Sequence, residues 1–217
     1  MLDSYKKERN QKINDMIQEI KLSDKTSIYK TNYNWEYDQK SFVERANQVE
    51  NFKLRHNIIL YFLFDCLEFR SINTFVLNCC KEISKKDPKE WAIKNWVWIT
   101  RGASEFDKEV REGKHDYNWH THTTTYDNFE QIITDWTFCF YIQMPDGLES
   151  TEGNVAFKTE DGKIHYFLPK EGEVFFFPGN IEHSTVGLMT GKNKDRVLIA
   201  GNISLDPLKV FKKNKLV

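Results

Sequence analysis

The chain has 217 residues and a formal net charge of −1, and this length suits one domain with a large core. The near-neutral charge argues against nucleic acid as the main partner, because such partners favour a basic protein face. Aromatic residues make up 14% of the chain while Gly and Pro are sparse, which excludes the disordered and collagen-like classes.

Neither a disulfide framework nor a targeting segment is expected. The four cysteines include one adjacent pair, Cys79 and Cys80, and show no CxxC spacing, so a disulfide scaffold or zinc knuckle is not predicted. The opening run MLDSYKKERNQKIND lacks the apolar segment of a signal peptide. The longest apolar run, IILYFLFDCLEF, carries Asp65 and Glu68 and is too short to span a bilayer. These features predict a soluble cytoplasmic protein that does not bind membranes.

Residues 1–92 are predicted to be mainly helical and to support the rest of the fold. Apolar residues at i, i+3, i+4 and i+7 predict an amphipathic helix over 13–20. The run SFVE at 41–44 has the pattern of a capping box, with its serine as the N-cap of a long helix that we expect to continue to Cys66. The run INTFVLNCCKEI predicts a further helix that ends before Pro88, and TSIYKTNYNW predicts a strand between the first two helices.

From about residue 93 to 205 the hydrophobic period changes to two and turn residues recur. Short strands after helices predict a mainly β fold with N-terminal helices (α+β): a β-sandwich or barrel buttressed on one side by the helices. No repeat or linker divides residues 1–217, so a single domain is predicted, with 206–217 as a C-terminal tail. The predicted strands are 94–100, 117–124, 136–144, 153–158, 163–168, 172–177, 183–188 and 196–204.

The run YNWHTHTTTYD places His120 and His122 two residues apart. In a strand over 117–124 both side chains would point to the same face. Two adjacent imidazoles in a barrel interior repel each other if charged and cost desolvation free energy if unpaired, whereas a divalent metal binds both as neutral ligands. The alternative is a solvated strand end that happens to contain histidine, and this run alone does not decide between the two.

The run GEVFFFPGNIEHSTVG carries a third candidate ligand. An apolar strand follows Gly172, a Pro-Gly-Asn turn follows the strand, and His183 begins the next strand. A lone histidine after a turn is more often structural than a ligand. Because this histidine would lie across a sandwich from the strand that carries the other two, the metal interpretation is favoured.

A strand near the end of the chain, RVLIAGNIS, carries an unusual polar row. Arg196 shares one face of this strand with Asn202 and Ser204. A guanidinium inside a barrel mouth needs a carboxylate partner, and a bidentate pair suits it best. The alternative is an arginine on an edge strand that pairs with a nearby acidic residue.

Taken in order, these pieces resemble the iron(II)- and 2-oxoglutarate-dependent oxygenases, and most closely a bacterial and phage-type branch of that superfamily. The matching runs between about residues 96 and 205 are WVWITRG, HTH, CFYIQMP, GNVAF, GEVFFFPGNIEH and RVLIAGN. The resemblance implies a double-stranded β-helix that binds Fe(II), 2-oxoglutarate and O2. It also implies hydroxylation of a small-molecule or side-chain substrate, with release of succinate and CO2.

The resemblance implies iron ligands at His120 and His183. Where the family has an acidic residue two positions after the first histidine, this chain has His122. The third ligand is then either His122, in a three-histidine centre, or Asp127 on the loop side of it; we expect His122 and hold Asp127 in reserve. The remaining candidates are interpreted as surface or turn residues: His115, Asp116 and His165.

The resemblance further implies that Arg196 holds the distal carboxylate of 2-oxoglutarate. Tyr141 and Gln143 alternate onto one face of their strand, and Asn202 shares the face of the arginine, so all three are candidates for binding the co-substrate. Ordinary core packing is the alternative for the aromatic residues. Two tryptophans are candidate walls of the pocket: Trp98 and Trp119.

Two other classes of protein fit part of the pattern. A cupin-type metal enzyme that does not use 2-oxoglutarate would explain the spacing from Gly172 through Pro178 to His183, but it has no specific need for Arg196. A metal-free jelly-roll binding module would bind no iron. The sequence carries no signal for the oligomeric state or for the identity of the substrate.

Overall fold

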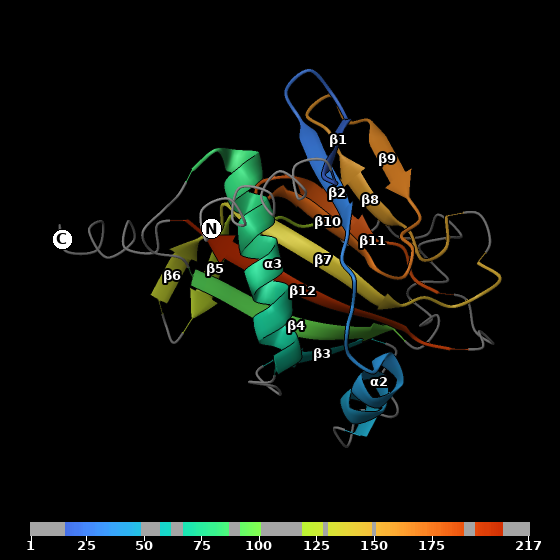
Figure 1. The fold of residues 1–217 in the computed structure, drawn as a ribbon. Helices are drawn as coiled ribbons and strands as arrows, with labels where there is room; N and C mark the ends of the chain where they lie inside the picture. The colour runs from blue at the N-terminus through green and yellow to red at the C-terminus, as the bar shows by residue number, and fades with distance from the viewer. Residues whose placement is uncertain are drawn as a thin grey trace.

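A computed structural model describes residues 16–48, 57–61, 67–86, 92–100, 119–127, 130–148, 151–188 and 194–205. The described strands form antiparallel sheets, one of seven strands in the order β1-β2-β10-β7-β12-β4-β3, one of three strands in the order β11-β8-β9, and the hairpin β5-β6 (Figure 1). The bounds are β1 Gln18–Lys21, β2 Ser27–Asn32, β3 Asn57–Tyr61, β4 Ala92–Thr100, β5 Thr124–Asp127, β6 Glu130–Ile133, β7 Trp136–Gln143, β8 Val155–Lys158, β9 Ile164–Phe167, β10 Glu173–Pro178, β11 Glu182–Thr185 and β12 Arg196–Ser204.

Two helices, α2 (Gln39–Gln48) and α3 (Leu67–Ser84), pack on one face of the seven-stranded sheet, and α3 crosses in front of its central strands in Figure 1. This layer is held by a large apolar cluster, because helix and sheet each bury one hydrophobic face against the other. Its members from the helices include Phe42, Phe69, Ile72 and Val76, and those from the sheet include Phe138, Phe140, Phe176, Ile199 and Ile203.

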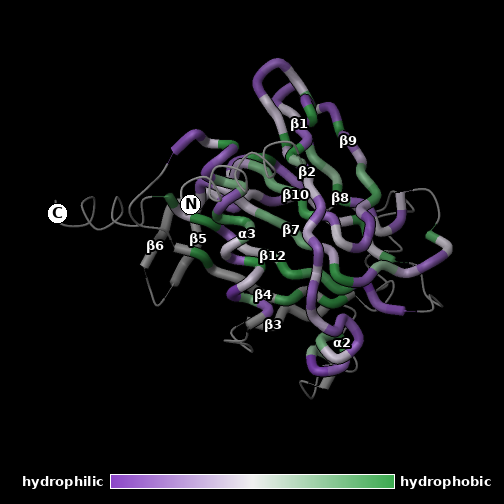
Figure 2. The backbone as a smooth tube through the Cα atoms, viewed as in Figure 1, coloured by the Kyte–Doolittle hydropathy of each residue, from purple (hydrophilic) through white to green (hydrophobic). Residues whose placement is uncertain are grey.

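A second apolar cluster lies between the seven-stranded and three-stranded sheets. Every residue of β12 is buried, because this central strand is covered on both faces. Its alternate residues divide between the two layers: Ile199 faces the helices, whereas Leu198 and Ala200 face the other sheet. Figure 2 shows the resulting hydrophobic stretches along the central strands. The inward row of β12 also carries Arg196 and Asn202, so polar groups enter this second core.

The helix predicted over 13–20 is wrong where the structure describes it, since this part of the chain contributes to β1. Ile20 lies opposite Ile28 of β2, and both side chains pack in the core between the sheets. The Ser23 hydroxyl accepts a hydrogen bond from the backbone N–H of Thr26 at 3.1 Å and closes the hairpin. A short apolar spacing does not distinguish helix from strand, and here cross-strand burial decided the outcome.

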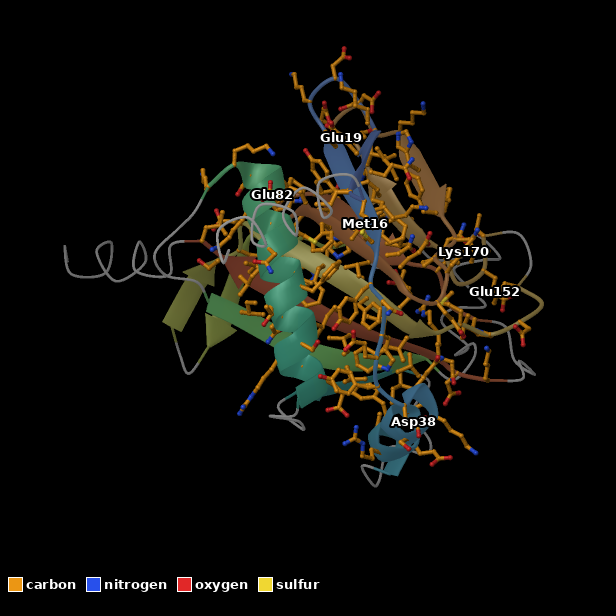
Figure 3. The ribbon with its side chains drawn as sticks, viewed as in Figure 1. Met16, Glu19, Asp38, Glu82, Glu152 and Lys170 are labelled. Carbon is orange, nitrogen blue, oxygen red and sulfur yellow. The ribbon has the colours of Figure 1, made fainter. Side chains whose placement is uncertain are left out.

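The helix predicted to start at Ser41 begins instead at Gln39, with Asp38 as its N-cap. One carboxylate oxygen of Asp38 accepts from the backbone N–H of Lys40 at 3.1 Å, and the Asp38 carbonyl accepts from Phe42 N–H at 3.0 Å. The Ser41 hydroxyl donates to the other carboxylate oxygen at 2.5 Å. Figure 3 labels Asp38 beside this helix. The serine therefore supports the cap and does not form it.

The continuation of that helix to Cys66 is wrong over residues 57–61, which form the edge strand β3 paired with β4. The run NIILY contains two adjacent β-branched residues, which favour a strand once a partner strand is available. The predicted helical half therefore supplies three strands of the seven-stranded sheet as well as the two described helices.

Most other predicted elements are confirmed. The helix before Pro88 is α3, the strand before Trp35 is β2, and the mainly β fold with helices on one face is as expected. Among the described residues, neither helix has the length and hydropathy needed to cross a membrane. The confirmed strands are β4, β7, β8, β9, β10 and β12, and β11 is shorter than expected. The predicted strand over residues 117–124 is the one that the described residues do not confirm.

Candidate metal centre

Three histidines meet beside the turn between β10 and β11. His120, His122 and His183 each offer a ring nitrogen, and these atoms lie within 4.8 Å of one another. The ring centroids of His120 and His183 are 4.3 Å apart, and His122 lies 4.9 Å from each. Two segments that are more than fifty residues apart in the chain thus supply one cluster of metal-type ligands.

The strand predicted over 117–124 is wrong, although the two histidines do converge as it implied. In the described part of this run, His120 forms an isolated bridge with His183: each backbone N–H donates to the other's carbonyl, at 3.1 and 3.0 Å. The pairing with β11 does not continue beyond this bridge. Instead, His122 N–H donates to the carbonyl of Gly179, in the turn before β11, at 2.7 Å. β5 starts only at Thr124. Backbone hydrogen bonds at His120 and His122, and not a regular strand, therefore hold the two residues in place.

The turn between β10 and β11 must approach the histidine segment closely. A Cβ atom added at Gly179 would lie 2.6 Å from the carbonyl oxygen of Thr134 and 3.0 Å from that of His122. Backbone atoms at such distances cannot give way without moving the segment. Glycine is needed here because no side chain fits between the turn and the chain that carries His122.

We expect Gly179→Ala to weaken metal binding by at least about tenfold, because it displaces the segment that holds His122 and outer contacts of this kind are worth about 10–100-fold in affinity. Calorimetric titration with Co2+ would measure the change. Gly147→Asn is the control: this exposed turn has φ +63° with open space around it, a conformation that asparagine tolerates. Equal affinity in Gly179→Ala and the parent would contradict the prediction.

Burial keeps two of the three clustered imidazoles neutral. Desolvation, together with the neighbouring His120, lowers the pKa of His122 to about 4. Desolvation and the other two imidazoles lower the pKa of His183 to about 3. At pH 7 both rings therefore lack the extra proton that would compete with a metal.

The ring of His183 is oriented by its surroundings. Its Nδ1 donates to the Ile181 carbonyl at 3.1 Å, which leaves Nε2 with its lone pair toward the cluster. The Phe177 ring packs against it at 4.6 Å between centroids, and Phe157 lies at 6.4 Å. A carbonyl that fixes the tautomer and an apolar wall that excludes water are typical surroundings of a metal-binding histidine.

His122 is approached from the sheet by a polar pair. The Thr137 hydroxyl donates to the Asn202 side-chain oxygen at 3.2 Å, and the Asn202 amide nitrogen lies 3.5 Å from Nδ1 of His122. Thr137 was not among the candidates drawn from the sequence. Thr137, Cys139 and Tyr141 are alternate residues of β7, so all three lie on its inward face. This alternation is the sequence signal that could have identified Thr137 as a candidate.

Arg196 is buried, with 1% of its surface exposed, and its side chain crosses from β12 to the three-stranded layer. There Nη1 donates to the carbonyls of Gly153 and Val186 at 3.3 and 3.1 Å. Val186 follows His183 by three residues, a separation of about 10 Å in extended chain. The guanidinium thus contacts the chain one residue past the end of β11, the strand that carries His183.

The other predicted co-substrate residues differ in their surroundings. Tyr141 is buried in the core between the sheets, where desolvation raises its pKa and the charge of Arg196 acts in the opposite direction. Its phenol therefore stays protonated and is a hydrogen-bond donor near the guanidinium. Gln143 instead donates from Nε2 to the carbonyl of Asp195 at 2.8 Å, which ties the end of β7 to the start of β12.

The remaining candidates lie partly outside the described residues. Trp119 is half-buried beside the ligand segment, and the Lys158 ammonium lies over its ring at 5.9 Å and bridges to Glu182 at 3.2 Å. His165 is half-buried on β9, in a strand and not in a turn. His115 and Asp116 lie outside the described residues, as do the side chains of Trp98 and Asp127.

The donor set fits a divalent transition metal. Three imidazoles at close range suit iron, nickel, copper and zinc, and they leave coordination positions for other ligands. A bound metal would also remove the cost of crowding three imidazoles into a desolvated site. The structure therefore brings together the three histidines predicted from the sequence, with Asn202 beside one of them.

No protein-family model matches the sequence, and no curated protein matches it. Solved structures do match. A prolyl hydroxylase from Trichoplax adhaerens, in complex with a peptide fragment of the hypoxia inducible factor oxygen degradation domain, has a TM-score of 0.56 at 12% identity, covering 98% of this chain and 96% of that chain. HygX from Streptomyces hygroscopicus, with nickel and 2-oxoglutarate bound, has a TM-score of 0.53 at 12% identity, covering 83% of each chain.

A prolyl-4-hydroxylase from Pseudomonas putida has a TM-score of 0.51 at 10% identity, covering 83% of this chain and 93% of that chain. At such low identity a structural likeness establishes the fold and leaves the reaction to be argued from the site. The chain therefore has the fold of these prolyl hydroxylases and of HygX.

Proposed function

We propose that the chain is an iron(II)- and 2-oxoglutarate-dependent dioxygenase that hydroxylates its substrate. The observation that carries the proposal is the cluster of three histidines, one buried and two half-buried, together with the buried Arg196 in the same sandwich. HygX, which shares the fold, has been crystallised with nickel and 2-oxoglutarate. When bound, iron(II) and 2-oxoglutarate would supply oxidation of a substrate C–H bond by O2, with release of succinate and CO2.

In this proposal the chain's own residues bind, orient and exclude water. His120, His122 and His183 would hold the iron, and Arg196 would receive the distal carboxylate of 2-oxoglutarate. The neutral Tyr141 phenol donates a further hydrogen bond to that carboxylate. The Phe177 and Phe157 rings keep water from the metal, which protects an oxidising site from side reactions.

The fold and the limits of the domain belong to the same proposal. The two facing sheets are consistent with a double-stranded β-helix, and the chain 1–217 would form one domain around it, with 206–217 as a tail. The substrate would be a small molecule or a side chain; the Trichoplax neighbour was solved with a peptide fragment. Gln143 and Asn202 stay predictions as co-substrate residues.

The third iron ligand is proposed to be His122, because its ring is already within the cluster. Asp127 is the alternative. Metal titration of His122→Ala and Asp127→Ala decides between them, since metal binding is lost only in the variant that lacks the true ligand. Retention in His122→Ala with loss in Asp127→Ala would transfer the role to the carboxylate.

Anaerobic addition of Fe(II) and then 2-oxoglutarate tests the proposal as a whole. We expect one iron per chain and a weak visible charge-transfer band that appears only when both are present, because the band arises from the chelate. Oxygen would then release succinate, even without substrate. Iron binding without the band would favour a cupin-type enzyme, and no iron binding at all would leave a binding module.

A further inference from the structure

We propose that Asn202, anchored by Thr137, positions His122 by setting which of its ring nitrogens carries the proton. The inference rests on the proposed metal site, because it concerns how one ligand is prepared for metal. It also gives Asn202 a role at the histidines that differs from contact with the co-substrate.

The pair lies on two neighbouring central strands of the fold. Thr137 of β7 and Asn202 of β12 are cross-strand partners in the middle of the seven-stranded sheet. Their exposed fractions are 1% and 5%. The hydroxyl donates to the asparagine Oδ1 at 3.2 Å, and the asparagine Nδ2 is 3.5 Å from Nδ1 of His122. A buried amide thus reaches the ring from a fixed strand, whereas His122 itself lies outside any strand.

The chemistry of the three groups links this hydrogen-bond chain to metal loading. A neutral imidazole carries one N–H, and only its other nitrogen can bind a metal. Because Nδ1 of His122 faces Asn202, Nε2 is the nitrogen available for metal. Metal binding at Nε2 therefore requires a proton on Nδ1 and an acceptor beside it.

Asparagine can meet that requirement by rotating its amide. With Nδ2 toward the ring, the amide donates to Nδ1, and the imidazole proton belongs on Nε2. With Oδ1 toward the ring, the amide accepts from Nδ1–H, while Nδ2 donates to the Thr137 hydroxyl, which can also accept. The second arrangement matches that of His183, whose Nδ1 donates to the Ile181 carbonyl. The pair therefore acts as a reversible support that adopts the accepting direction when metal binds.

The test is Co2+ titration of the whole chain, followed by calorimetry and by visible absorption. We expect Asn202→Leu, which fills the space without a hydrogen bond, to bind Co2+ about 10–100-fold more weakly. Asn202→Asp, which can only accept, should bind more tightly than the parent, because it favours the Nδ1–H tautomer. Thr137→Val should weaken binding, and Thr137→Ser, which keeps the hydroxyl, should restore it.

A second readout and a control variant distinguish control of the His122 tautomer from a purely structural role of Asn202. Nitrogen-15 NMR of the metal-free protein reports the His122 tautomer, which should shift toward Nδ1–H in Asn202→Asp and become mixed in Asn202→Leu. Asn154→Leu is the control, since Asn154 is an equally buried asparagine in the other layer; it should leave Co2+ affinity unchanged. Wild-type affinity in Asn202→Leu with an unchanged tautomer would overturn the inference. Failure of the parent itself to bind Co2+ would instead overturn the proposed metal site.

Discussion

Replacing His183 by alanine is expected to abolish metal binding. The change removes one of the three clustered ring nitrogens, so the loss should exceed the roughly 10–100-fold that follows from disturbing an outer contact of a metal ligand. It also removes a ring that packs against Phe177, so the metal-free protein should lose about 1–3 kcal/mol of unfolding free energy. Calorimetry with Co2+ or anaerobic Fe(II) measures the first effect, and thermal unfolding the second.

His165→Ala is the matched control for this prediction. His165 is a half-buried histidine of the same three-stranded sheet, on β9, two strands away from the strand of His183. Its loss should leave one metal bound per chain with parental affinity. A His183→Ala variant that is folded and still binds metal like the parent would show that the cluster is not the metal site.

Replacing Arg196 by alanine should remove 2-oxoglutarate binding while leaving iron binding in place. The proposed contact is a charge-assisted pair between guanidinium and carboxylate in a buried site, and each such hydrogen bond is worth about 1.5–3 kcal/mol, so we expect a loss of about 100-fold or more in co-substrate affinity. Titration of 2-oxoglutarate, followed by the anaerobic charge-transfer band, measures this affinity. The band of the parent at saturating 2-oxoglutarate gives the reference amplitude. Arg196→Lys should lose less, because it keeps the charge but not the planar fork.

Two further measurements make this result specific. Arg196 also donates to the carbonyls of Gly153 and Val186, so its removal destabilises the fold, and thermal unfolding must confirm that the variant is folded at the assay temperature. Arg45→Ala serves as the control, because this partly exposed arginine on α2 pairs with Glu68 of α3, far from the histidines in the chain. Unchanged 2-oxoglutarate affinity in folded Arg196→Ala would exclude the arginine as the anchor and favour a cupin-type chemistry.

The strands around the site were predictable because their signals are local. In β10, five residues in a row are buried, and turn residues follow immediately at Pro178 and Gly179. In β12, the predicted bounds match the observed ones at both ends. A short apolar run and the turn residues beside it lie within a few positions of one another, so the sequence displays them together.

The errors fall where tertiary contacts overrode short local patterns. Residues 13–20 carry an apolar spacing that suits a helix, yet Ile20 lies in β1, opposite Ile28 in the core between the sheets. Residues 57–61 became an edge strand because β4 offered a free side for pairing. In both cases the local preference was weak, and pairing with a distant strand decided the outcome.

By itself, the sequence determined the chemical inventory: two histidines two apart, a third after a glycine turn, and Arg196 on an inward row. Only the tertiary structure decided how they meet. Hydrogen bonds between His120 and His183, and from His122 to Gly179, bring the rings together without the predicted strand. The reason is physical: ligand identity is a property of single residues, whereas convergence depends on backbone contacts between segments far apart in the chain, which no local pattern encodes.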